Sequence, residues 1–280
     1  MIIKIAVSSD NHIDVNRQDP EEVLAFQSQW LQAHGIDYYL FAGDLFNNFQ
    51  KTADYMSLLQ SKTPSTKVFY IAGNHDMLGA SSEEQIENFA SDQYLHNQYV
   101  DLPGTDWRLI GNNGWYDYSF STYRDQAKEV ERWKKVFWLD SSTPQDESDG
   151  QRVARVLTQS RQQLIAAQHH NKKVLFLTHF APRHELLAPK PAAVNTPRRE
   201  RIYQMINAMM GSDALGNLLA DYPSVQTVFY GHLHGQHPDW RWHGISFLHQ
   251  AVGVKNKRIN EWQAPMFEQQ WVKTLRVMEF

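Results

Sequence analysis

Residues 67–76 read KVFYIAGNHD, an apolar, strand-like run followed at once by Gly73, Asn74, His75 and Asp76. The same arrangement recurs four more times, at Asp10-Asn11-His12, Gly43-Asp44, Thr178-His179 and Gly231-His232-Leu233-His234-Gly235. In sheets whose strands alternate with helices, ligands bind outside the carboxyl ends of the strands. Asp, Asn and His are metal-ligand types, so the five turns predict one metal site at the ends of strands near residues 2–7, 38–42, 67–71, 174–177 and 227–230.

The composition sets limits on the class of protein. A chain of 280 residues can form one large or two small domains. Because the outermost motifs lie more than 200 residues apart yet should build one site, we expect a single domain over 1–280 with an insertion or cap-like segment at about 113–150. The net charge of −4 argues against a general nucleic-acid binder.

Other classes of site and location are constrained as well. The chain has no cysteine, which excludes disulfides, thiolate ligands and cysteine nucleophiles. No apolar stretch approaches the length of a membrane span, so no membrane partner is expected. The N-terminus lacks the pattern of a signal peptide, and we therefore expect a cytoplasmic location.

Helical and strand-like stretches alternate through most of the chain, which predicts an α/β sandwich. Asp19 is a suitable N-cap and Pro20 a suitable first residue for a helix over 20–33. Further helices are expected near 52–60, 82–90, 128–138 and 152–169, and further strands near 107–110, 245–249 and 273–278. The segments 113–150 and 181–201 depart from this rhythm and are candidate loops over the site.

The motifs resemble those of calcineurin-like metallophosphoesterases, from residue 1 to about residue 253. The resemblance implies a four-layer α/β fold in which two mixed β-sheets pack face to face between helices. It also implies two divalent metal ions per chain, with Asp44 as the bridging ligand. By position in the motifs, the ligands of one ion would be Asp10, His12 and His234, and those of the other Asn74, His179 and His232.

The resemblance assigns catalytic roles too. His75 would act as the general acid that protonates the leaving oxygen, and Asp76 would orient its ring. The family often has Asp where this chain has Asn47, and a basic residue where it has Asn48. Neither position is a direct ligand, so the metal site should be retained.

The predicted reaction is hydrolysis of a phosphate mono- or diester of a small phosphorylated substrate by a metal-bridging hydroxide. A mixture of imidazole, amide and carboxylate ligands suits Mn, Fe, Zn or Ni better than Ca or Mg alone. Two alternatives remain at this stage. One is a metal-dependent nuclease of the same family, and the other is a non-catalytic protein-binding scaffold.

Substrate contacts are less defined by the sequence. Trp115, Tyr116 and Tyr118 open an aromatic segment that could form either a small core or a wall against the substrate. Arg183, with Lys190 and the arginines at 198, 199 and 201, could form either a solvated face or a clamp for phosphate. We expect the aromatic segment to border the metal site.

Overall fold

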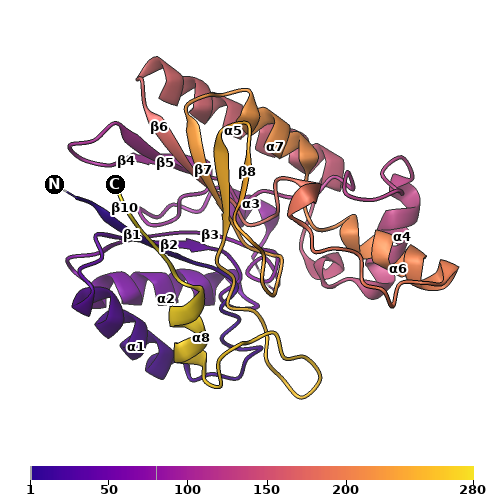
Figure 1. Ribbon diagram of the computed structural model, residues 1–280, viewed down its shortest axis with the longest axis horizontal. Coiled ribbons are helices and arrows are strands. Elements are labelled where there is room, and N and C mark those ends of the chain that lie inside the picture. The colour runs from indigo at the N-terminus through magenta and orange to yellow at the C-terminus, as the bar shows by residue number, and fades with distance from the viewer. Residues whose placement is uncertain (1, 80) are drawn as a thin grey trace.

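The computed structural model describes residues 2–79 and 81–280. Two β-sheets are stacked face to face, with helices on both outer sides (Figure 1). The smaller sheet has the order β10-β1-β2-β3 and the larger one β4-β5-β6-β7-β9-β8. The strands are β1 (Lys4–Ser8), β2 (Tyr38–Ala42), β3 (Lys67–Ile71), β4 (Gln98–Asp101), β5 (Trp107–Gly111), β6 (Lys173–Leu177), β7 (Val225–Tyr230), β8 (Trp240–Trp242), β9 (Ile245–His249) and β10 (Arg276–Glu279).

The inner strands are parallel and the edge strands antiparallel. β1, β2 and β3 pair in parallel, as do β5, β6, β7 and β9, whereas β10, β4 and β8 run antiparallel to their neighbours. Parallel inner strands are buried on both faces, which is why they read as continuous apolar runs in the sequence. Their carboxyl ends therefore meet at one edge of each sheet.

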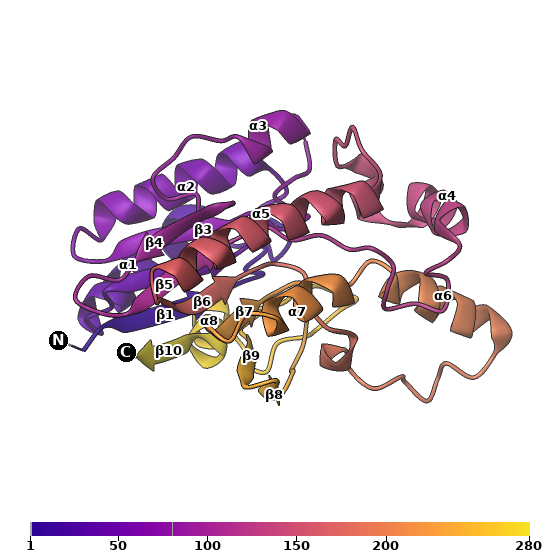
Figure 2. The same ribbon diagram turned by 90° about the horizontal axis from the view of Figure 1, so that it is seen from above.

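Three apolar layers hold the sheets and helices together. Between the sheets, Val7, Leu40 and Ile71 pack with Leu175 and Phe229. The helices are α1 (Pro20–Ala33), α2 (Phe49–Lys62), α3 (Glu83–Glu87), α4 (Ala127–Phe137), α5 (Asp149–His169), α6 (Pro197–Asn207), α7 (Asp213–Ala220) and α8 (Phe267–Thr274), with 3₁₀ turns η1 (Leu139–Ser142) and η2 (His184–Leu186). α1, α2 and α8 cover the smaller sheet, and α5 and α7 cover the larger one (Figures 1 and 2). The expected four-layer α/β sandwich is confirmed.

Two segments, one with α4 after β5 and one with α6 after β6, form a lobe beyond the sheets. α4 and α6 lie side by side there, away from the covering helices (Figures 1 and 2). A salt bridge of 2.9 Å between Arg201 and Glu129 joins the two helices. The segment 113–150 is therefore not one loop, because it contains α4 and η1.

Two expectations about the C-terminal half are wrong in detail. Residues 273–278 were expected to form one strand, but α8 continues to Thr274 and the strand begins at Arg276. The segment 181–201 was expected to be a loop, yet α6 begins at Pro197, where the Thr196 hydroxyl accepts a hydrogen bond from the Arg199 backbone N–H. Thr followed by Pro is a helix-start signal that the Pro- and Arg-rich composition obscured. In the described part of the chain, no helix is long and apolar enough to cross a membrane.

Candidate metal centre

The five turns meet where the parallel strands of both sheets end. Asp10 and His12 follow β1, Asp44 follows β2, Asn74 follows β3, His179 follows β6, and His232 and His234 follow β7. Backbone hydrogen bonds tie the turns together: Asp10 N–H donates to Gly43 O at 2.9 Å and Gly231 N–H donates to His179 O at 2.9 Å. Residues more than 200 positions apart thus form one cluster.

The cluster consists of two groups with Asp44 between them. In the first group, His234 Nε2 lies 3.0 Å from His12 Nε2 and 3.5 Å from Asp10 Oδ1. In the second, Asn74 Oδ1 lies 3.1 Å from His179 Nε2 and 2.9 Å from His232 Nδ1. Asp44 Oδ2 is 3.8 Å from His12 Nε2 and 3.3 Å from His179 Nε2, so one carboxylate reaches both groups. All seven residues expected at the site are brought together.

The hydrogen bonds of the ring nitrogens that point away from the cluster show which ring nitrogens towards the cluster carry lone pairs. His179 Nδ1 lies 2.8 Å from Ala42 O, and His232 Nε2 lies 3.1 Å from Met209 O. A carbonyl oxygen only accepts, so these nitrogens carry the protons. In the neutral rings, the opposite nitrogens are then bare lone pairs that face the Asn74 oxygen. Lone pairs that converge at this distance call for a positive charge among them, either a proton on a ring nitrogen or a metal ion. The donor set therefore fits a divalent metal ion.

The electrostatics of the cluster agree with a cation site. Burial acts to lower the pKa of His179, but the neighbouring Asp44 carboxylate outweighs it and raises that pKa to about 9. Burial also opposes a charge on His234, yet Asp10 and Glu261 raise its pKa to about 10. Burial acts to raise the pKa of Asp10, but hydrogen bonding to His234 and the charge of His179 lower it to about 2. The buried carboxylates therefore attract positive charge to both groups.

The backbone at the cluster is unusual. Asp10, His12, Asp44 and His232 have positive φ values of 52°, 44°, 65° and 66°. Such conformations cost energy in non-glycine residues and persist where the surroundings enforce them, which is typical of functional sites. At Gly73, a Cβ atom would collide with the Asp44 carboxylate and the His179 ring, so only glycine fits there.

His75 adjoins the cluster without belonging to either group. Its backbone N–H donates to Asp44 Oδ1 at 2.8 Å, and its ring lies 4.5 Å from the His12 ring. Its Nδ1 is 2.7 Å from Asn47 Oδ1. The expectation that Asp76 orients this ring is wrong, because the ring's partner is Asn47.

Asp76 instead holds the loops of the site. Its fully buried carboxylate accepts from the backbone N–H groups of Asp44, Leu45, Phe46 and Gly73 and from the Thr52 hydroxyl. Burial and the adjacent Asp44 charge raise the pKa of Asp76 to about 6. Asp76 thus fixes the turn that carries Asp44 relative to the turn that carries Asn74.

Two acidic residues that the sequence analysis did not single out orient the expected ligands. Asp140 Oδ1, from η1, accepts from Asn74 Nδ2 at 2.8 Å. Glu261 Oε2 lies 2.9 Å from His234 Nδ1. Both partners are far from the motifs along the chain, and no local pattern marks them.

The pocket beside the cluster has a different lining from the one expected. Its volume is about 420 Å³, and it is lined by Asp44, Asn74, His75, His232 and His234 together with Phe137, Trp138, Leu139, Ile206 and Met210. Trp115, Tyr116 and Tyr118 are buried and do not line it. Trp115 Nε1 and the Tyr118 hydroxyl donate to Asp149, and Tyr116 stacks on Trp115. Of the two alternatives for this segment, a small core or a wall against the substrate, these three residues form the core.

Arg183 is not placed as a phosphate clamp either. Its guanidinium is mostly buried, pairs with Glu185 at 2.6 Å and donates to Asn217 at 2.6 Å. It also stacks on the Trp242 ring at 4.3 Å. These partners use the hydrogen-bond donors of the Arg183 guanidinium, and Arg183 does not line the pocket beside the cluster.

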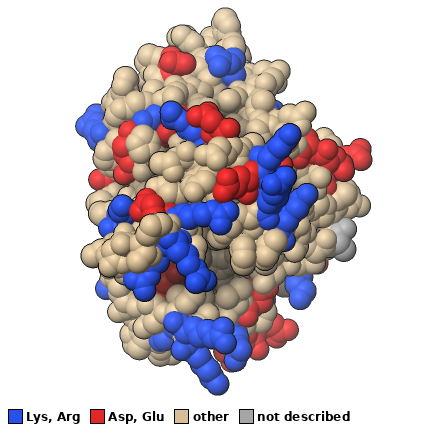
Figure 3. Space-filling view, turned by 90° about the vertical axis from the view of Figure 1, so that its right-hand side faces the viewer, with Lys and Arg blue, Asp and Glu red and all other residues tan. Residues whose placement is uncertain are grey.

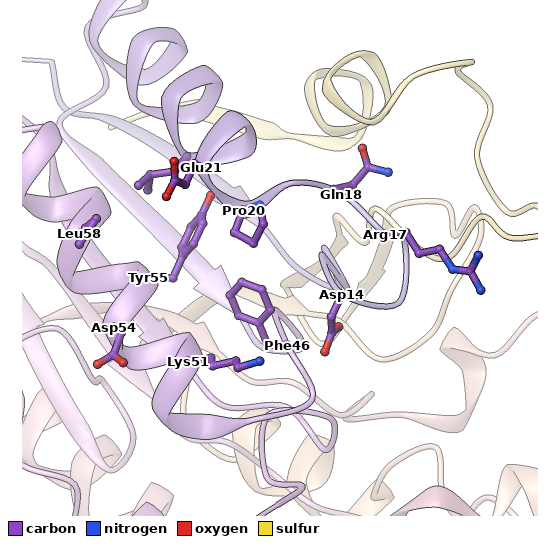
Figure 4. Close-up of a pocket in the computed structure, with 11 residues that line it drawn as sticks. Asp14, Arg17, Gln18, Pro20, Glu21, Phe46, Lys51, Asp54, Tyr55 and Leu58 are labelled. Atoms are coloured by element: carbon purple, nitrogen blue, oxygen red, sulfur yellow. The ribbon is translucent and has the colours of Figure 1, made fainter.

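A larger cavity of about 560 Å³ lies near the site but not at it. It opens between α1 and α2 and is lined by Phe46, Tyr55 and Leu24 with charged residues at its rim, including Asp14 and Lys51 (Figure 4). None of the seven clustered residues lines it. We therefore place the chemistry in the smaller pocket, where the ligand types converge.

Comparisons with known proteins bear on the family and the fold of this chain. The family model "calcineurin-like phosphoesterase" matches residues 3–236. The crystal structure of a dimetal phosphatase from Danio rerio is similar to this chain, with a TM-score of 0.52, 13% sequence identity, and coverage of 88% of this chain and 86% of that one. GAP50, the anchor in the inner membrane complex of Plasmodium, has a TM-score of 0.46 and 10% identity, over 91% of this chain and 76% of that one. No curated protein matches in a sequence search. With its motifs in one cluster and a family match over most of its length, this chain belongs to the calcineurin-like phosphoesterase family, whose members hydrolyse phosphoesters with the help of metal ions.

Proposed function

We propose that this chain hydrolyses a phosphate mono- or diester of a small molecule at a centre of two divalent metal ions, with His75 as the general acid. The observation that carries the proposal is the convergence of ring nitrogens, an amide oxygen and carboxylates into two groups that share Asp44. The first ion would be held by Asp10, His12 and His234, and the second by Asn74, His179 and His232.

When bound, such ions make a water molecule nucleophilic and offset the negative charge of the phosphate. The chain keeps the negative charge of the proposed ligand set small. Asp10 and Asp44 are the only carboxylates among the seven proposed ligands, while the other ligands are neutral. Because two carboxylates balance only half the charge of two divalent ions, the centre stays cationic and attracts an anionic ester.

His75 is placed to deliver a proton to the leaving oxygen. It lines the pocket, and its backbone N–H is held by Asp44. With Nδ1–H donating to Asn47 Oδ1, a proton given up from Nε2 comes from the doubly protonated ring. Asn47 therefore fixes the direction in which His75 faces, and general acid catalysis of this kind contributes about 10²–10⁴-fold to a rate.

A nuclease activity is the second candidate, and one observation favours it. On the face that carries α4 and α6, Lys and Arg side chains gather around a hollow (Figure 3). Several of these charges are paired, however: Arg201 with Glu129 and Lys190 with Glu200. Among the described residues, no Lys or Arg lines the pocket beside the cluster, so we favour a small ester over a polyanion.

An activity screen separates these functions. Protein supplied with Mn²⁺ is tested on phosphomonoesters, phosphodiesters, cyclic nucleotides, and single- and double-stranded DNA, with a chelator as control. We expect hydrolysis of small esters that the chelator and Asp44→Asn abolish. Cleavage of DNA alone would favour the nuclease, and no hydrolysis of any substrate would favour the scaffold.

A further inference from the structure

We infer that the preferred substrates are phosphate esters whose organic group is compact and apolar. The inference rests on the proposed function and deepens it by naming the substrate class. Its basis is the division of the pocket into two ends. One end is formed by Asp44, Asn74 and the histidines of the cluster, and the other by Phe137, Trp138, Leu139, Ile206 and Met210.

The apolar end is built by the lobe beyond the sheets. Phe137 ends α4, Trp138 follows it, and Leu139 is the first residue of η1. Ile206 lies on α6 and Met210 just after it. Trp133 braces this wall, with ring centroids 5.4 Å from Phe137 and 6.1 Å from Trp138. The two helices are joined across the lobe by the salt bridge between Arg201 and Glu129.

The wall is also fixed relative to the metal cluster. Asp140 Oδ2 accepts from Trp138 Nε1 at 3.1 Å, while its Oδ1 accepts from Asn74 Nδ2. One buried carboxylate therefore connects an indole of the wall to a proposed metal ligand. When the phosphate group of an ester is held at the cluster, its organic group lies along this wall, whose position relative to the cluster is fixed.

The exposure of the wall indicates that something apolar covers it. Phe137 is 67% exposed and Leu139 is 45% exposed, although both line a pocket. Contiguous apolar surface at a pocket is typical of a ligand-binding site. The volume of about 420 Å³ lies in the range of pockets for small molecules, which makes a compact occupant suitable.

The magnitude of the preference follows from burial. Each methylene group that enters an apolar wall should raise kcat/KM by about fourfold until the pocket is filled. A polar organic group such as glycerol gains nothing from these side chains and must give up water to contact them. The chain should therefore discriminate between esters with similar leaving groups but different apolar area.

The test compares ethyl, butyl and hexyl phosphate with glycerol phosphate, all of which have alkoxide leaving groups, in the presence of Mn²⁺. The variants are Phe137→Ala and Ile206→Ala. The matched control is Val136→Ala, since Val136 is 71% exposed on the same helix but does not line the pocket. Titration calorimetry with hexylphosphonate and methylphosphonate, which are not hydrolysed, measures binding separately from turnover.

We expect kcat/KM to rise along the alkyl series and hexylphosphonate to bind more tightly than methylphosphonate. Phe137→Ala and Ile206→Ala should each reduce the ratio of hexyl to glycerol phosphate roughly 3- to 10-fold, and Val136→Ala less than twofold. Hydrolysis of all four esters at equal efficiency, or equal ratios in the three variants, would overturn the inference alone. No hydrolysis of any of the esters would overturn the proposed function and this inference with it.

Discussion

Replacing Asp140 should weaken one metal site and leave the other intact. Asp140 is 2% exposed and accepts from Asn74 Nδ2 at 2.8 Å. An ionised carboxylate accepts hydrogen bonds and donates none. Asp140 therefore holds the Asn74 amide with Nδ2 towards itself and Oδ1 towards His179 and His232. Asp140→Ala removes this restraint and leaves a buried N–H group without its partner.

The expected loss of metal affinity follows from the type of hydrogen bond that is removed. A hydrogen bond to a charged group contributes about 1.5–3 kcal/mol, which corresponds to roughly 10- to 100-fold in affinity. Loss of a residue that orients a metal ligand typically has the same effect, about 10- to 100-fold. Asp140→Asn keeps an uncharged acceptor and should cost less, about tenfold or below.

The assay isolates each site by removing the other. His234→Ala keeps the ligands of the second ion, and His232→Ala keeps those of the first. Mn²⁺ affinity is measured by equilibrium dialysis in each background with and without Asp140→Ala. Asp125→Asn serves as the control, because Asp125 lies in the same segment with its side chain 92% exposed. Equal losses in both backgrounds, or no loss in the His234→Ala background, would refute the reasoning.

Three further predictions concern catalysis, acid stability and the aromatic core. His75→Ala should retain its metal ions and lose about 10²–10⁴-fold in kcat on alkyl esters, with a smaller loss on nitrophenyl phosphate, which needs little protonation; equal losses on both esters would contradict the general-acid role. Glu87 is paired with His96 at 3.0 Å, and although burial opposes it, this contact lowers the pKa of Glu87 from 4.5 to about 2. A lowered pKa stabilises the fold above pH 4.5 and ceases to do so as the pH falls towards 2, so urea unfolding should show Glu87→Gln less stable than the wild type at pH 7 and equal to it near pH 2, unlike the exposed control Glu84→Gln. Trp115→Ala should cost about 3–5 kcal/mol of unfolding free energy without changing the preference among esters; an altered preference in a stable variant would place Trp115 at the substrate after all.

The clustering of the proposed ligands could be predicted from the sequence because the signal of each turn is local. Each motif places its ligand types directly after a buried strand, and parallel strands bring such turns to one edge. The helix at 20–33 was predicted to the residue for the same reason, since Asp19 caps it and Pro20 opens it. Where a turn directly follows its strand in the chain, the order of residue types is enough to predict both of them.

The surroundings of the ligands could not be predicted because they depend on tertiary packing. Asp140 lies 66 positions from Asn74, and Asn47 lies 28 positions from His75. The aromatic segment shows the same limit. Trp115 and Phe137 have similar chemistry, but packing buries the first and leaves the second at the pocket. Only the fold of the lobe decides which aromatic residues meet a substrate.

The central claim is a shared centre of two metal ions, and metal analysis of wild type and Asp44→Asn tests it most directly. Protein produced with added Mn²⁺ and purified without chelator is measured by plasma mass spectrometry. The account predicts two ions per wild-type chain, and a loss from both sites in Asp44→Asn because one carboxylate reaches both groups. Fewer than one ion per wild-type chain, or an Asp44→Asn variant that retains both ions, would contradict it.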